Sequence, residues 1–171
     1  MMKLYLLMMV LAVTGSNHPA GPSTSPSTAA PGEIGSRLPE FSTKDLRGRG
    51  LSSSALLGKV VLVDFWATWC QPCKKEMPGY QKLLDRYRTR GFEVVGFKFD
   101  VMSDTEDPLQ FAKKAGVKYR LAVATEDIRN KFGGIEGLPT TMLYNRDGIL
   151  CKKVIGFEYT DAFEKALEPL L

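Results

Sequence analysis

An almost unbroken apolar run occupies positions 60–66, which read Val-Val-Leu-Val-Asp-Phe-Trp. A run of this length and composition predicts a central β-strand that is covered on both faces. A different spacing follows between Pro72 and Arg90, where every third or fourth residue is apolar and the pattern predicts one amphipathic helix. Proline suits the first turn of such a helix, and Gly91 suits its C-terminal cap.

The rest of the pattern alternates short strands with short helices. Residues 41–51 predict a small hairpin, and residues 52–57 predict a single helical turn. Strands are expected at 92–99, 121–124, 140–144 and 149–155, with helices at 107–116, 127–132 and from Thr160, as N-cap, to the C-terminus. This order predicts an α/β fold with a mixed central sheet that is parallel in its centre and antiparallel at one edge, flanked by helices.

The first 36 residues have a different composition. Residues 1–15 combine Lys3 with a short apolar stretch, which indicates a signal peptide or an N-terminal anchor. Residues 16–36 are rich in Pro, Ser and Thr and predict a flexible linker, so residues 37–171 form the predicted domain. Both interpretations of the leader export the domain, so the sequence indicates a periplasmic or extracytoplasmic protein, which the anchor interpretation tethers to a membrane through its N-terminus.

Composition removes several classes of function. The net charge of +4 comes with no basic stripe, which argues against nucleic-acid binding. The chain has three cysteines and one histidine, and His18 lies in the predicted linker. Histidine-based catalysis is therefore disfavoured, and so is a zinc site, because tetrahedral zinc needs four protein ligands.

The remaining chemistry is concentrated in Cys70-Gln71-Pro72-Cys73, placed where the central strand leads into the main helix. The free N–H groups and the dipole of a helix N-terminus stabilise a thiolate, and a thiolate is the reactive form of cysteine. Lys74 and Lys75 add positive charge nearby. We therefore expect Cys70 to be the nucleophile and Cys73, one turn further on, to be the resolving thiol. A purely structural disulfide is a weaker alternative, because so small a ring restrains little chain.

Residues 61–78 resemble the active-site segment of the thioredoxin superfamily, and Trp66-Ala67-Thr68-Trp69-Cys70 followed by residues 74–78 most resembles the TlpA/ResA branch. The resemblance runs from about residue 38 to the C-terminus. It implies a thioredoxin-like fold with an N-terminal hairpin and an extra inserted helix at about residues 101–116. It also implies an exported thiol–disulfide oxidoreductase, and that Leu138-Pro139 form a cis-proline loop that binds an extended substrate segment beside the dithiol.

Two acids have alternative interpretations. Asp64 is either an acid at a strand end facing water or a buried carboxylate with a raised pKa that accepts the proton of Cys73. The resemblance matches it to the buried aspartate of thioredoxins. Glu76 is either a solvated acid on the helix surface or, by the resemblance, the glutamate of the cytochrome-maturation members of the branch.

Three further side chains have predicted places. We expect Trp69 to line an apolar groove beside Cys70, and Trp66 to pack in the core. Cys151, in the last strand, is expected to be a buried, inert thiol, and a regulatory or intermolecular thiol is the less favoured alternative.

Four functions remain open at this stage. The leading one is reduction of extracytoplasmic protein disulfides, such as those of apocytochrome c, with electrons from a membrane thiol carrier and no cofactor beyond the Cys70–Cys73 pair. The alternatives are an oxidant of secreted proteins and a client-binding protein without redox turnover. A peroxidase is disfavoured, because Ala67 stands where that relative of the fold has Thr or Ser.

Overall fold

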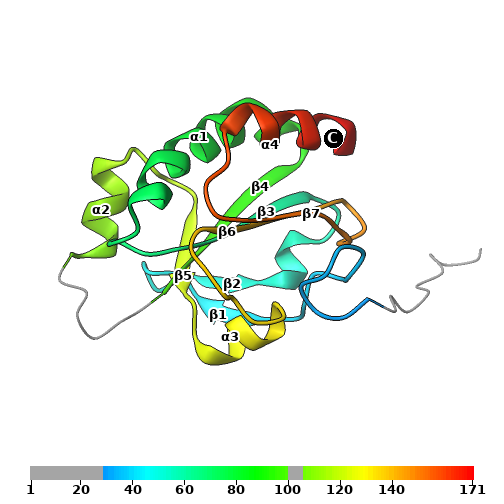
Figure 1. Cartoon of the computed structure of the whole chain (residues 1–171), viewed down its shortest axis with the longest axis horizontal. Coiled ribbons are helices and arrows are strands. Elements are labelled where there is room, and N and C mark those ends of the chain that lie inside the picture. The colour runs from blue at the N-terminus through cyan, green and yellow to red at the C-terminus, as the bar shows by residue number, and fades with distance from the viewer. Residues whose placement is uncertain (1–28, 100–105) are drawn as a thin grey trace, which may run out of the picture.

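The computed structural model describes residues 29–99 and 106–171 (Figure 1). The predicted leader, most of the predicted linker and the first part of the expected insertion lie outside these residues. In the described part of the chain, no helix has the length and apolar character needed to span a membrane.

A five-stranded sheet forms the centre of the molecule, in the order β5-β4-β3-β6-β7 (Figure 1). Strands β3, β4 and β5 are parallel, whereas β6 runs antiparallel to β3, and β7 runs antiparallel to β6. The predicted mixed sheet is thereby confirmed. The strands are β3 Val60–Trp66, β4 Phe92–Lys98, β5 Arg120–Val123, β6 Thr140–Tyr144 and β7 Leu150–Ile155.

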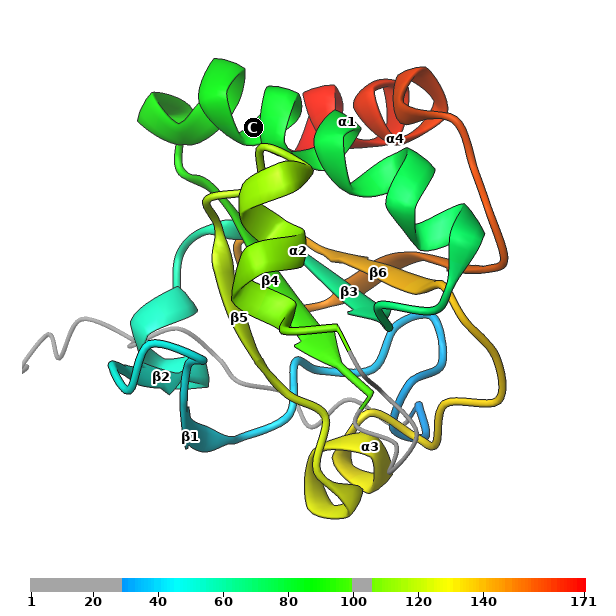
Figure 2. The same cartoon turned by 90° about the vertical axis from the view of Figure 1, so that its left-hand side faces the viewer.

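Helices cover one face of this sheet, and the hairpin with a short helix lies against the other (Figure 2). The first layer contains α1 Gln71–Tyr87 with η2 Arg88–Arg90, α2 Pro108–Lys114, and α4 Thr160–Leu167 with η3 Glu168–Leu170. The second contains β1 Ser42–Lys44, β2 Gly50–Ser52, η1 Ser53–Leu56 and α3 Glu126–Lys131. The hairpin and the helical turn that the sequence predicts are both present.

The alternation of side chains along β3 divides the core in two. Leu62 and Trp66 belong to the cluster under the helices, whereas Val63 and Phe65 belong to the cluster beneath the hairpin and α3. Successive side chains of a strand point to opposite faces. Asp64 therefore points to the same face as Leu62 and Trp66, toward α1.

The start of α4 differs from the prediction. Its N-cap is Tyr159 rather than Thr160, and no side chain caps the helix. The Thr160 hydroxyl instead packs against α1 at Gly79, where an added Cβ would lie 1.9 Å from Thr160 Oγ1. A glycine at position 79 thus lets the two helices approach each other closely.

The packed chain also begins earlier than residue 37. The Gly35 N–H donates to the Leu150 carbonyl (2.9 Å), and the Leu150 N–H donates to the Ser36 carbonyl (2.8 Å). Gly32, with φ 78°, lies against the Phe132 carbonyl, where a side chain would have no room. Composition alone does not reveal this attachment, because the segment is held by backbone contacts rather than by apolar side chains.

Candidate active site

The two cysteines of the motif meet at the start of α1. Cys70 is the N-cap residue of this helix and forms a disulfide with Cys73, with Cα atoms 5.3 Å apart. Pro72 lies in the first turn, as expected, and the Cys73 N–H donates to Cys70 Sγ (3.3 Å). Since helix N–H groups stabilise an anion, the reduced Cys70 sulfur occupies the favoured position for a thiolate.

The proline loop lies next to the strand that leads into the motif. The Leu138–Pro139 peptide is cis, and Thr140 after it pairs with Phe65 of β3. Leu138 packs against the core cluster that includes both cysteines of the motif. The start of α1, the start of β6 and the end of β7 lie together on the right-hand side of Figure 2. The fold thus brings the dithiol and the proline loop to one end of the sheet.

Two carboxyl groups lie buried on the helix face of the sheet near this dithiol. Asp64 and Glu76 have 0% and 1% of their surface exposed, so the interpretations that place them in water are wrong. No oxygen of either carboxyl has a well-formed hydrogen bond among the described residues. Burial raises the pKa of Asp64, and burial together with the charge of Asp64 raises the pKa of Glu76. The proton-acceptor role of Asp64, and the match of Glu76 to the glutamate of the cytochrome-maturation members, stay predictions.

Two buried tyrosines complete the surroundings of the carboxyls. The Tyr80 hydroxyl lies 3.2 Å from Thr141 Oγ1, and the buried Tyr119 hydroxyl has no hydrogen-bond partner among the described residues. Burial, with added repulsion from Asp64, raises the pKa of both tyrosines. Sequence reasoning treated Tyr80 only as a core residue, although its position four residues after Glu76 could have placed it beside that acid.

The two tryptophans differ in exposure, and the buried position predicted for Trp66 is confirmed, whereas the apolar groove predicted at Trp69 stays a prediction. Trp66 is fully buried and stacks on Phe111 of α2, with ring centroids 5.1 Å apart. Trp69 is 54% exposed immediately before Cys70. The Lys74 ammonium lies 3.8 Å from Glu106, which precedes α2, and over the ring of Phe111 in α2. The positive charge of Lys74 is therefore paired with this region.

The prediction for Cys151 is wrong, because this thiol is exposed. Strand β7 is an edge strand, and its register against β6 shifts between Leu143 and Tyr144. Leu143 pairs with Lys152 and Tyr144 pairs with Leu150, so Cys151 is the extra residue of a β-bulge. A bulge changes the face on which a side chain lies, and the apolar pattern of the strand did not reveal it.

Sequence reasoning also missed the end of β7 and the residues that follow it. Ile155 is 53% exposed beside Gly137 of the proline loop, and the Gly156 N–H donates to the Pro139 carbonyl (2.8 Å). The exposed rings of Phe157 and Tyr159 pack edge to face, 5.1 Å apart. The signal available in the sequence was a pair of aromatic residues, Phe157 and Tyr159, shortly after Gly156.

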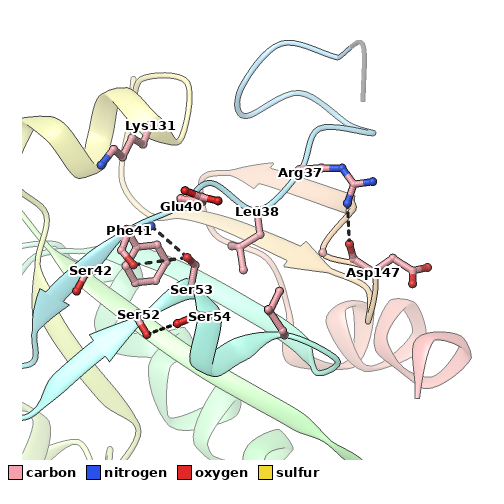
Figure 3. Close-up of a pocket in the computed structure, with 12 residues that line it drawn as sticks. Arg37, Leu38, Glu40, Phe41, Ser42, Ser52, Ser53, Ser54, Lys131 and Asp147 are labelled. Atoms are coloured by element: carbon pink, nitrogen blue, oxygen red, sulfur yellow. Dashed lines mark hydrogen bonds between the residues drawn. The ribbon is translucent and has the colours of Figure 1, made fainter. Parts of the chain in front are cut away.

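An open groove on the hairpin side shares no residue with this site (Figure 3). Serines of the hairpin strands and of η1 line it, together with charged residues such as Arg37, Glu40 and Lys131. Ser53 exchanges hydrogen bonds with the Phe41 backbone there, and Arg37 donates to the Asp147 carbonyl. Among the described residues, no cluster of His, Cys, Asp and Glu is arranged to hold a metal ion.

Reversible disulfide exchange is the chemistry that a cysteine pair supports at a helix start, and the fold and pair together define a thioredoxin-fold thiol–disulfide oxidoreductase. The chain belongs to the AhpC/TSA family, whose family model matches residues 34–153. It is 33% identical over 142 residues to the thiol-disulfide oxidoreductase ResA of Bacillus cereus, an alignment that covers 81% of this chain and 79% of that protein.

Two further similarities agree with this assignment. The ResA protein of Bacillus subtilis is 34% identical over 122 residues, which cover 71% of this chain and 67% of that one. The structure of a thiol:disulfide interchange protein from Chlorobium tepidum matches with a TM-score of 0.71 and 27% identity. That match covers 81% of this chain and 97% of the other. The chain is thus a thiol–disulfide oxidoreductase of the ResA type.

Proposed function

We propose that this enzyme works outside the cytoplasm as a reductase of protein disulfides, with the haem-site cysteines of apocytochrome c as its class of client. The observation that carries this proposal is the buried carboxyl pair behind the dithiol. Strong oxidants of this fold have a high reduction potential because the thiolate of their reduced form is stabilised. Buried acids that ionise near the two sulfurs oppose such a thiolate, and they favour a reducing pair.

The exchange proceeds in two balanced steps. The Cys70 thiolate attacks one sulfur of the client disulfide, which forms a mixed disulfide and releases the first client sulfur as a thiolate. Cys73 then gives its proton to the buried carboxyl pair and attacks Cys70 Sγ. This second step forms the Cys70–Cys73 disulfide and releases the second client thiolate, and both client thiolates take up protons. The enzyme has lost two electrons and the client has gained them.

Substrate binding in this proposal uses the exposed side of the proline loop. The backbone before Pro139 pairs with an extended client segment, and Leu138 and Trp69 contact its side chains. A membrane thiol carrier then reduces the Cys70–Cys73 disulfide, so no dissociable cofactor takes part. The leader at residues 1–15 and the linker after it export the domain or tether it to the membrane.

The first experiment measures the reduction potential of the Cys70–Cys73 pair against glutathione and thioredoxin buffers. A value near the roughly −270 mV of thioredoxin supports the reductase. A value near the roughly −120 mV of a strong oxidant overturns that direction and makes the enzyme a disulfide donor.

A trapping experiment tests the order of the two steps. We expect Cys73→Ser to accumulate a mixed disulfide with a peptide that carries a C-x-x-C-H disulfide, whereas Cys70→Ser forms none. The control is Cys151→Ser, which leaves both cysteines of the motif in place. Client binding that is unaffected by Cys70→Ser would instead support a binding protein without redox turnover.

A further inference from the structure

A pair of buried hydroxyl groups joins α1 to the sheet beside Asp64. The Tyr80 hydroxyl lies 3.2 Å from Thr141 Oγ1, and 0% and 1% of these two residues is exposed. In the register between β3 and β6, Thr141 is the residue directly opposite Asp64. Opposite side chains of an antiparallel pair lie on the same face of the sheet, with Cβ atoms roughly 5 Å apart. The hydrogen bond to Thr141 therefore holds the Tyr80 phenol next to the Asp64 side chain.

The same phenol lies on the face of α1 that carries Glu76. Cys73, Glu76 and Tyr80 are all buried residues of this helix, and residues four apart on a helix are neighbours. Phe163 of α4 packs edge to face on the Tyr80 ring, with ring centroids 5.3 Å apart, so the ring is held from a second side. Tyr80 is thus the residue of α1 whose hydroxyl reaches the sheet between the two buried carboxyls.

The number of hydroxyl hydrogens leaves one for the carboxyls. Tyr80 and Thr141 carry one hydroxyl hydrogen each, and the bond between them uses one. The oxygens of Asp64 and Glu76 are buried acceptors without a well-formed hydrogen bond among the described residues. A carboxylate attracts such a hydrogen more strongly than a neutral carboxyl does. In agreement with this placement, donation from Tyr80 lowers the pKa of Glu76, although burial and the charge of Asp64 raise it by more.

We infer that Tyr80 is a positioning residue for the exchange reaction: Thr141 donates to the phenol oxygen, and the phenol hydrogen is thereby aimed at the buried carboxyls, where it stabilises the carboxylate that receives the proton of Cys73. In the resolving step that proton passes from Cys73 Sγ to a carboxyl oxygen, and the phenol keeps its own hydrogen. The hydrogen bond to the carboxyls is a property of the fold, and only its consequence for Cys73 rests on the proposed function.

Other titratable and charged groups also face the carboxyls. The buried Tyr119 hydroxyl comes from the segment before β5, and Glu158 comes from the segment after β7. Lys152 of β7 forms an ion pair with Glu158. The variants described next leave all of these groups in place, so a change in the titration of Asp64 and Glu76 reports on the hydroxyl pair.

The test removes single oxygens and keeps the packing. Tyr80→Phe takes the donor from the carboxylate, so we expect the ionisation midpoint of the carboxyl pair to rise by about one pH unit. Thr141→Val leaves the phenol without its orienting partner and should raise the midpoint by a smaller amount, whereas Thr141→Ser keeps the hydroxyl and should restore the wild-type midpoint. The double variant, Tyr80→Phe with Thr141→Val, should match Tyr80→Phe alone, because Thr141 acts through Tyr80.

The measurement is a carbon-13 NMR titration of labelled aspartate and glutamate carboxyls in the oxidised protein. Asp64→Asn and Glu76→Gln assign the two signals. The matched control is Tyr144→Phe, which removes a buried hydroxyl that donates to Met142 Sδ in the cluster on the other face of the sheet. This control should leave the midpoint unchanged.

The sign of the shift separates this role from a structural one. If Tyr80 only packs α1 against the sheet, its loss admits water to the carboxyls and lowers the midpoint, because water stabilises the charged form. A lowered or unchanged midpoint in Tyr80→Phe overturns the inference. A double variant that shifts the midpoint further than Tyr80→Phe overturns the part assigned to Thr141.

A kinetic measurement then tests the consequence for Cys73. Release of the client from the Cys70 mixed disulfide should need a higher pH in Tyr80→Phe, in step with the raised midpoint of the carboxyls. A shifted titration with an unshifted release profile overturns the link to Cys73. Failure of the proposed reductase function would appear separately, as absence of mixed-disulfide formation in Cys73→Ser.

Discussion

Asp45 and Asp64 are both aspartates with almost no exposed surface, 5% and 0%, yet their pKa values shift in opposite directions. Burial raises the pKa of Asp45 too. Hydrogen bonds from Arg49, from Arg120 and from the backbone of the hairpin turn together outweigh burial, so the net pKa is lowered. Asp64 accepts no such hydrogen bond from any residue that the structure describes. Burial alone therefore does not decide whether an acid is charged, since the supply of donors does.

The two acids also serve different parts of the molecule. Asp45 ties the β1–β2 hairpin to β5, because its Oδ2 accepts from Arg49 Nε and from Arg120 Nε at 2.8 Å each. Asp64 makes no such link within residues 29–99 and 106–171, and it lies buried on the helix face of the sheet with Glu76. The Asp45 carboxylate, with hydrogen bonds to both oxygens, links the hairpin to the edge strand β5. The Asp64 and Glu76 carboxyls, without such bonds among the described residues, lie on the side of the sheet that carries α1 and the dithiol. This contrast gives three predictions.

The largest expected effect comes from Asp45→Asn. The amide has no negative charge to pair with Arg49 and Arg120. We therefore expect the free energy of unfolding at pH 7 to fall by about 3 kcal/mol. Because the folded pKa of Asp45 is lowered, its contribution is complete above the unfolded value of 3.8 and is lost as pH falls through the folded value. Urea unfolding of the wild type and the variant at pH 7 and at pH 2.5 measures the loss of stability and its dependence on pH. An equal loss at the two pH values would contradict the electrostatic explanation.

The second effect has the opposite sign. The folded pKa of Asp64 is raised, so the folded protein loses stability as pH rises from the unfolded value of 3.8 through the folded one. We expect Asp64→Asn to raise unfolding free energy by about 2 kcal/mol at pH 8.5 and to leave it nearly unchanged at pH 4. The same variant should slow the resolving step between Cys73 and the mixed disulfide.

Two outcomes would break the prediction for Asp64. A variant that is no more stable than the wild type at pH 8.5 shows that the carboxyl carries no cost of burial. A variant with unchanged turnover and an unchanged Cys73 titration removes the proton-acceptor role. Glu164→Gln serves as the control for loss of a carboxylate away from the site.

The smallest expected effect is that of Cys151→Ser. This substitution replaces a thiol with a hydroxyl on the surface, whereas the two aspartate variants change a buried group. Since Cys151 is exposed in a bulge of an edge strand, we expect a change in stability within about 0.5 kcal/mol. A thiol reagent should label one equivalent in the oxidised wild-type protein and none in the variant. A thiol that reacts only after unfolding would show that the side chain is buried after all.

The sequence predicted most of the fold because the relevant signals are local. The apolar run at 60–66, the helical spacing after Pro72 and the turn at Asn145–Gly148 each fix an element through its own residues. The strand-to-helix junction also fixed the place of Cys70 and Cys73 at a helix start. The cis peptide before Pro139 was available only through the resemblance to a family, since a turn of this composition is usually trans.

Tertiary structure decided the features that depend on distant parts of the chain. Asp64 could face water or the core until α1 covered its side of the sheet, and Glu76 gained its neighbour only through that packing. The bulge that exposes Cys151 depends on the register between β6 and β7. The contact of the residues after β7 with the proline loop depends on the hydrogen bond from Gly156 to Pro139. Local patterns determined which elements form and where the cysteines lie. Long-range packing decided which charges are buried together, because burial and charge coupling are properties of neighbours that the sequence does not place side by side.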